Sequence, residues 1–343
     1  MFRNNILLYI YSNAVVTYVK RISLLRNGGS GLKYFLMCVS MLVLVLTACT
    51  AEELATPKPS SPIESDIATC ASTEEYLEAE MICALPLKCT NNMSCIERGN
   101  QLVKDLTMAY GSLTDELGED VEEGPLTVIA TYDIDLAEEL IESTKDLPQQ
   151  TLDRHATMWF DFAWLIPEKE RADINRFEVF RSSDTLAHIY MNNPEEVEAR
   201  WTLGINEAEP YIASEKMVTY VHEFSHIVSL RDNQVDYYAS EEQCEGFWSE
   251  GVCIRAGAYL HNFYTQFYET DDVLYTEESF VSEYAMVNIE EDFAETFAYF
   301  VLTAYPQADR IVDDKIRFFY NYPQFVELRA DILRRAATWL ATQ

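Results

Sequence analysis

The residues best suited to chemistry are His222, Glu223 and His226, in the run His-Glu-Phe-Ser-His. They lie in an apolar stretch, residues 218–230, whose spacing predicts a helix. Residues four apart share one helix face, so both imidazoles can reach one ion while the glutamate holds a water beside it. This arrangement indicates a zinc site that activates water for hydrolysis. The alternative is that two histidines merely share a solvated helix face.

A tetrahedral zinc ion that keeps one water needs a third protein ligand. The pattern that adds a third histidine to such a helix fails here, because Ser229 and Asp232 stand at the required positions. We therefore expect a carboxylate ligand. Two candidates remain open, Glu291 in a predicted helix and Glu250 in a Trp-Ser-Glu-Gly turn.

The helix that carries Glu291 has a phenylalanine stripe on one face and Glu291 and Glu295, four residues apart, on another. If Glu291 binds zinc, Glu295 can accept the N–H of a ligand histidine and so fix the orientation of its ring. A competing interpretation is a capping box, because Asn288 precedes Glu291 by three residues.

These two segments resemble a known family. The run His222-Glu-Phe-Ser-His226, with Tyr284-x-x-x-Asn288-x-x-Glu291-x-Phe293-Ala294-Glu295-x-Phe297, is similar to the catalytic core of anthrax lethal factor and of the Pro-Pro endopeptidases, which are gluzincin-type zinc metallopeptidases. The resemblance covers residues 215–230 and 284–300. It implies that Glu291 is a zinc ligand, that Glu295 supports a ligand histidine, and that Tyr284 stabilises the oxyanion or helps to protonate the leaving group. About 65 residues separate His226 from Glu291, more than in lethal factor.

We thus expect Zn²⁺ on His222, His226 and Glu291, with Glu223 as the general base in attack of a zinc-bound water on a peptide or protein substrate. Tyr284 would donate a hydrogen bond to the developing oxyanion. One alternative is a non-catalytic surface lipoprotein, a binding module on the same fold. Another is a metal-dependent hydrolase of a non-peptide substrate.

The surrounding pattern predicts an α+β fold. Expected strands precede the 213–230 helix, and mostly helices follow it, including one at 284–300 and two at the C-terminal end. The resemblance makes this fold zincin-like. Either of the two strands nearest the site would offer an edge to an extended peptide. His188 lies on one of them and is expected to be structural, like His155 and His261. The strands are expected at residues 124–133, 177–181, 186–191 and 200–205, an early helix at 135–146, and the last two helices at 316–320 and 325–342.

The N-terminal region predicts export. Residues 1–48 hold five Lys and Arg and no Asp or Glu, and an apolar run then leads to Leu-Thr-Ala-Cys49. This pattern is typical of a lipoprotein signal, with Cys49 as the lipidated residue. We expect a flexible tether at 49–69, a Cys-rich helical segment at 70–120 and the metallopeptidase domain at 121–343. The predicted location is the bacterial cell envelope, anchored to a membrane by lipid.

Six cysteines remain beyond the signal and the lipidation site, an even number that suits disulfides in an exported chain. Their clustering predicts that the first four pair among themselves and that the last two form a bridge. A four-cysteine metal site at 70–95 is the weaker alternative, since paired C-x-x-C spacing is absent. The six are Cys70, Cys83, Cys89, Cys95, Cys244 and Cys253.

The net charge of the chain is −32. This acidity argues against a nucleic-acid partner, because phosphate backbones attract basic surfaces. It indicates no particular site.

Overall fold

The computed structural model describes most of the chain beyond residue 69: residues 70–78, 80–114, 126–135, 140–143, 146–183, 185–192, 201–208, 212–269 and 276–343. The predicted signal at 1–48, Cys49 and the tether at 49–69 lie outside the described residues. The described residues all belong to one compact unit of the chain.

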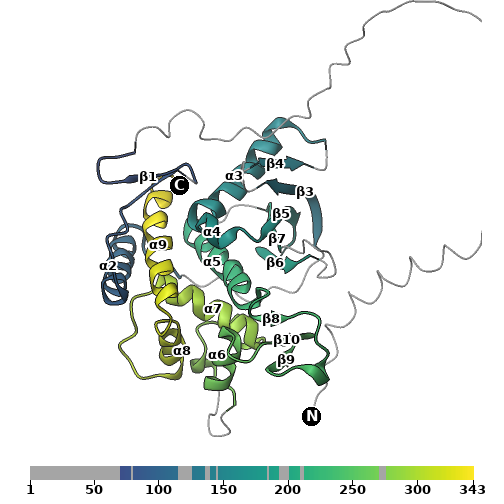
Figure 1. Cartoon of the computed structure of the whole chain (residues 1–343). Coiled ribbons are helices and arrows are strands. Elements are labelled where there is room, and N and C mark those ends of the chain that lie inside the picture. The colour runs from purple at the N-terminus through teal and green to yellow at the C-terminus, as the bar shows by residue number, and fades with distance from the viewer. Residues whose placement is uncertain are drawn as a thin grey trace, which may run out of the picture. The chain divides into compact units, whose positions relative to one another are not determined.

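A five-stranded mixed sheet forms the first half of this unit, in the order β4-β3-β5-β7-β6 (Figure 1). The pair β5 and β7 is parallel and the other pairs are antiparallel. Together with the helices this confirms an α+β fold with small sheets. The strands are β3 (Thr127–Asp135), β4 (Leu140–Ser143), β5 (Ile174–Arg181), β6 (Ala187–Met191) and β7 (Trp201–Asn206).

Two sequence-based expectations about this sheet were wrong. Residues 135–146 do not form a helix, because 140–143 are strand β4, paired with β3. Leucine, alanine and glutamate favour a helix there, but strand pairing overrides that preference. The 200–205 strand cannot offer a free edge, since β7 pairs with β5 and with β6. Among the described strands, β6 is the edge on this side of the sheet.

Helices α3 (Gln149–Leu165) and α5 (Ala213–Leu230) belong to the same half as the sheet. The short helix α4 (Glu168–Arg171) lies between them in the sequence. Trp159 of α3 packs on Phe177 of β5, with ring centroids 5.8 Å apart, and Phe162 packs on Tyr220 of α5 at the same distance. These side chains are almost fully buried. They fix α5 through aromatic contacts, each of which removes a large apolar area from water.

Helix α5 contacts both the edge strand β6 and helix α7 (Ile289–Leu302), so the predicted active-site helix joins the sheet to the helical half (Figure 1). Phe224 and Phe297 meet across the α5–α7 contact, at 6.3 Å between ring centroids. The helical half contains α6 (Tyr259–Phe267), α8 (Ile311–Phe319) and α9 (Pro323–Leu340). Buried phenylalanines from α6, α7, α8 and α9 form its core.

The expectation of mostly helices after residue 230 did not include a second sheet. A small three-stranded sheet, ordered β8-β10-β9, follows α5 and contains the hairpin that precedes α6. The Cys244–Cys253 disulfide closes this hairpin. Its strands are β8 (Val235–Asp236), β9 (Phe247–Ser249) and β10 (Val252–Ile254), and 3-10 turns lie at η2 (Glu241–Gln243), η3 (Glu277–Ser279) and η4 (Tyr284–Met286).

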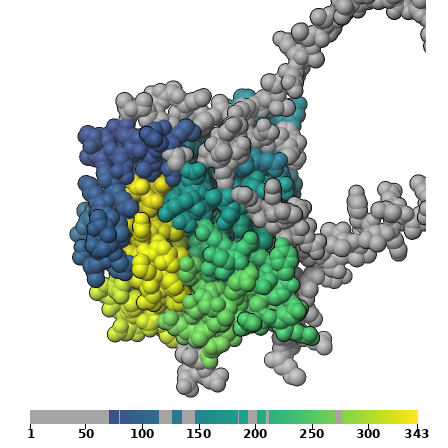
Figure 2. All heavy atoms as spheres, in the orientation of Figure 1, coloured from purple at the N-terminus to yellow at the C-terminus, as the bar shows by residue number. Residues whose placement is uncertain are grey.

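The Cys-rich segment is a hairpin, β1 (Glu75–Leu77) and β2 (Ile82–Ala84), followed by helix α2 (Asn92–Tyr110). It therefore contains strands as well as the expected helix. Residues 70–114 lie against α9, as the blue and yellow surfaces in Figure 2 show. Disulfides Cys70–Cys83 and Cys89–Cys95 confirm that the first four cysteines pair among themselves.

No helix within the described ranges is both long and apolar enough to span a bilayer.

Candidate metal centre

Helix α5 places His222 and His226 one turn apart, with their Nε2 atoms 3.2 Å from each other. Both rings are largely buried, and His222 is 6% exposed. The helix forms because apolar side chains recur on the face that packs on the core, among them Val221 and Phe224, both fully buried. The two imidazoles thus converge at one point beside the helix.

Helix α7 brings Glu291 to the same point. Its Oε2 atom lies 3.2 Å from Nε2 of His222 and 3.5 Å from Nε2 of His226. Asn288 is the cap of this helix, and its side-chain oxygen accepts the backbone N–H of Glu291 at 2.8 Å. Capping therefore uses the backbone of Glu291 while its carboxylate faces the histidines, so the two interpretations of this residue are compatible.

The spacing of these three atoms suits a small cation. Zinc binds histidine nitrogen and carboxylate oxygen at about 2.0–2.1 Å, so two ligands of a tetrahedral ion lie about 3.3–3.4 Å apart. The three observed separations, 3.2, 3.2 and 3.5 Å, bracket this edge length. Oε2 of Glu291 is buried and faces the Nε2 atoms of these two histidines. These residues therefore fit a zinc ion.

A second carboxylate supports the first histidine. Oε1 of Glu295 lies 2.6 Å from Nδ1 of His222, and Ser282 donates a hydrogen bond to the other Glu295 oxygen at 2.7 Å. The bond to Glu295 leaves Nε2 of His222 facing Glu291. A carboxylate behind a ligating histidine fixes the tautomer and strengthens the ligand. Ser282 could not be identified from the sequence, because no spacing rule links it to Glu295.

The electrostatics also call for a cation. Burial disfavours protonation of His222, but its hydrogen bonds to Glu291 and Glu295 raise its pKa well above the ordinary value. Burial raises the pKa of Glu291, but hydrogen bonds from the two histidines outweigh it and hold that pKa well below the usual range. Two buried carboxylates, on Glu223 and Glu295, and the half-buried carboxylate of Glu291 surround two imidazoles. A divalent ion would compensate this excess of negative charge.

Glu223 and Tyr284 lie beside the group of possible ligands. Glu223 is 6% exposed, and burial raises the pKa of its carboxyl group while the neighbouring histidines lower it. Tyr284, in the 3-10 turn η4, places its ring 5.8 Å from that of His222 and is 53% exposed. The site thus has a buried carboxylate on one element and an accessible phenol on another.

The alternative ligand, Glu250, is not part of this group: the set near α5 that could hold a metal ion consists of His222, His226 and Glu291. Glu250 is exposed at the tip of the β9–β10 hairpin, where its φ is +44° and that of Gly251 is +90°. Its neighbour Ser249 donates a hydrogen bond to Glu290, the residue before the proposed ligand. The hairpin therefore contacts helix α7 but contributes no residue to the group of possible metal ligands.

The remaining histidines lie elsewhere. His155 is buried between Tyr132 and Glu207. His188 stacks on Phe180, with ring centroids 4.7 Å apart. His261 lies on α6, where its Nδ1 atom accepts a backbone N–H. None of them belongs to a group of metal-ligating side chains in the part of the chain that the structure describes.

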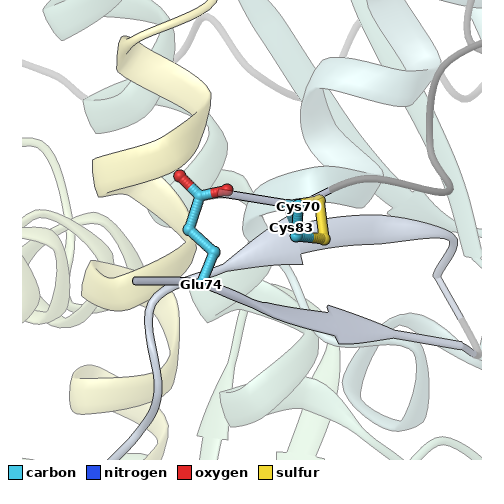
Figure 3. Close-up of side chains that lie close together, drawn as sticks. All are labelled: Cys70, Glu74 and Cys83. Atoms are coloured by element: carbon cyan, nitrogen blue, oxygen red, sulfur yellow. A yellow bond between two sulfur atoms is a disulfide. The ribbon is translucent and has the colours of Figure 1, made fainter. Parts of the chain in front are cut away.

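A second group, Cys70, Glu74 and Cys83, has metal-like spacing (Figure 3). Its two sulfur atoms are joined in a disulfide, and the Glu74 carboxylate accepts the backbone N–H of Ala71 at 3.0 Å. Bonded sulfurs are not thiolate ligands. This group is therefore a stapled turn, and the four-cysteine metal site is excluded as well.

Comparisons of the chain with protein-family models, with curated proteins and with solved structures found no match.

Proposed function

We propose that this chain is a zinc metalloendopeptidase that is exported and anchored to the cell envelope by lipid. The observation that carries the proposal is the convergence of His222, His226 and Glu291 at tetrahedral edge distances, with Glu295 bonded behind His222. These residues come from two helices that are far apart in the sequence, and the resemblance to gluzincin-type enzymes assigns the same roles to the same positions.

The roles follow from the positions. Zinc bound by these three side chains would supply Lewis-acid activation of a water and of the substrate carbonyl. Glu223 accepts a proton from the attacking water and returns it to the leaving amine. Its burial suits this task, because a raised pKa brings a carboxylate closer to the pH at which it must exchange protons. Tyr284 donates a hydrogen bond to the oxyanion as the carbonyl is attacked.

The edge strand β6 provides the place for an extended substrate. It packs on α5 and has no strand partner on its outer side among the described residues. A peptide that adds to this edge would form backbone hydrogen bonds with β6 and lie beside helix α5. The three disulfides agree with an oxidising compartment outside the cytosol.

The proposal is tested by measuring bound zinc and proteolysis for the wild type and for Glu223→Gln. We expect about one zinc per chain in both, and a loss of activity in the variant of roughly a hundredfold to ten-thousandfold, the usual contribution of a general base. His226→Ala should lose the zinc as well. Unchanged proteolysis in Glu223→Gln would refute its role. If protein purified without chelator holds no zinc, a binding module would be favoured. If the protein cleaves muropeptides instead of peptides, a hydrolase of non-peptide substrates would be favoured.

A further inference from the structure

The part of the chain that flanks the metal centre is unusually poor in positive charge. Residues 232–309 contain 17 Asp and Glu residues but a single Lys or Arg, Arg255. That arginine is already engaged, since it faces Asp236 at 3.5 Å and donates to the backbone carbonyls of Asp232 and Val235. This segment includes the β9–β10 hairpin, η4 and α7. A cation that neutralises its charge must come from another segment or from another molecule.

Helix α7 shows where such a cation is missing. Four of its residues are carboxylates, and three of them have positive or imidazole partners. Asp292 binds Lys315 at 2.7 Å, Glu295 binds His222, and Glu291 faces the two histidines. Glu290 is the fourth, and it has no cationic partner among the described residues: its carboxylate accepts the hydroxyl of Ser249 and the N–H of its own backbone.

Glu290 is nevertheless buried, with 7% of its surface exposed. Its Oε1 atom accepts the Ser249 hydroxyl, while Oε2 is buried with no partner in the described part of the chain. A buried carboxylate oxygen without a partner is costly, because it has lost its hydration and gained nothing in return. The carboxylate points to the hairpin, since Ser249 precedes the turn at Glu250 and Gly251.

Glu290 also lies close to the metal centre. It is the neighbour of Glu291 in the chain, on the first turn of the same helix α7. It belongs to no group of three metal-ligating side chains among the described residues, so a second metal ion has too few ligands there. A single buried carboxylate beside a hydroxyl is instead suited to one ammonium or guanidinium group.

We propose that Glu290 and Ser249 form a substrate subsite that accepts a Lys or Arg side chain next to the cleaved bond, and that Glu250 and the acidic 232–309 segment draw cationic peptides to it. The inference rests on the proposed peptidase function. A substrate cation would pair with Glu290 Oε2, and the long-range field of the acidic segment would raise the rate of encounter in a salt-dependent manner.

The test uses the full zinc-loaded chain and a peptide library whose cut positions are read by mass spectrometry. We expect Lys or Arg to be enriched at one position flanking the cleaved bond. Internally quenched peptides that differ there only in Lys or Gln should then differ in kcat/KM by about tenfold to a hundredfold, as a desolvated charge-assisted bond typically provides. Glu290→Gln should bring that ratio close to one.

The matched control is Glu242→Gln, which removes the same charge from an exposed position of the same segment. It should leave the Lys-to-Gln ratio almost unchanged. An equal reduction by Glu242→Gln and Glu290→Gln would overturn the assignment of Glu290, since the preference would then come from the overall field. Cleavage by the wild type with no preference for Lys or Arg would overturn the inference but leave the peptidase proposal standing.

A binding measurement separates this inference from catalysis. In the Glu223→Gln background, calorimetry with the Lys peptide and the Gln peptide should give a tighter Kd for Lys, which weakens as NaCl is raised. Adding Glu290→Gln should remove most of that difference. Equal Kd values for the two peptides would contradict the subsite even if no peptide is cleaved, whereas the absence of cleavage by a zinc-loaded wild type would count against the peptidase proposal itself.

Discussion

The β1–β2 and β9–β10 hairpins are both short and both closed by a disulfide. They differ in whether the charged side chains that the neighbouring helix places against them have partners of opposite charge. Against β1–β2, α9 supplies Arg334 and Arg335, which face Glu75 and Glu80 at 2.6 and 2.7 Å. Against β9–β10, α7 supplies Glu290, which accepts a serine hydroxyl but has no cationic partner in the described part of the chain. The first hairpin is held by charges that the chain itself pairs, and the second leaves a charge for something else to pair.

The contrast teaches how a structural ion pair differs from a site. Where the fold must dock its N-terminal segment, each arginine faces carboxylates from both sides, because Asp331 on α9 also contacts both of them. In these pairs each charge is neutralised within the molecule, although Nη1 of Arg335 is buried with no hydrogen-bond partner among the described residues. A carboxylate that is buried with one oxygen unpaired is complete only when a ligand arrives, so it marks a position for binding.

The largest expected effect comes from breaking the paired side. Arg335→Ala should lower the free energy of unfolding by about 3–5 kcal/mol, because it leaves Glu80, with 9% of its side chain exposed, without its cation. Urea unfolding of the zinc-loaded protein measures this. Arg176→Ala, which removes an arginine from an exposed pair with Asp133, should cost no more than about 1 kcal/mol. Similar losses in the two variants would remove the distinction.

The buried histidine His155, whose neighbouring charges are paired within the chain, makes the stability of the protein depend on pH. Burial, with the positive charge of Arg154, lowers the pKa of His155 to about 4 from the ordinary 6.5. The carboxylate of Glu207 does not offset this, since Arg154 and Arg181 already engage it. The unfolded chain therefore binds a proton below pH 6.5 that the folded chain refuses until about pH 4.

The sign follows directly. The contribution of His155 to stability is fully present above pH 6.5 and is lost as the pH falls towards 4. Between pH 7 and pH 5 the wild type should lose about 2 kcal/mol that His155→Gln does not lose. Urea unfolding of both proteins at equal zinc content tests this, and curves that stay parallel from pH 7 to pH 5 would show that His155 does not titrate in this way.

The smallest expected effect on the free energy of unfolding comes from Glu290, beside the β9–β10 hairpin, and its sign is opposite to that of Arg335→Ala. Glu290→Gln keeps an oxygen for the Ser249 hydroxyl and removes a buried charge that lacks a counterion. The free energy of unfolding should therefore stay the same or rise, by up to about 1 kcal/mol. Urea unfolding beside Arg335→Ala sharpens the comparison. A loss of 2 kcal/mol or more would show instead that Glu290 has a structural partner.

Much of the candidate metal centre could be predicted from the sequence, because its geometry is local to two helices. The i and i+4 spacing of His222 and His226, and of Glu291 and Glu295, determines which side chains share a face. Distance in the sequence hides the rest. Ser282 and Ser249 contact glutamates on α7 through loop and hairpin geometry, and a serine in a loop carries no signal of such a contact.

The fold was predictable to a similar depth. The strands with β-branched residues were recognised within a few positions, whereas β4 was mistaken for a helix because its pairing with β3 outweighs local propensity. Helix α3 had no clear signal. Its N-cap is Pro148 with no side-chain cap, and it is buried on most of its surface, so no single apolar face stands out.

The edge strand β6 has a consequence for the behaviour of the protein in solution. Within the described part of the chain this edge is unpaired, and an unpaired edge offers its backbone groups to any strand, including the same strand of a second copy. A net charge of −32 makes two copies repel each other, while a cationic peptide would be attracted to the same molecule. The negative charge of the chain would thus disfavour pairing of β6 with β6 of a second copy, while it would still allow a cationic peptide to bind at this edge.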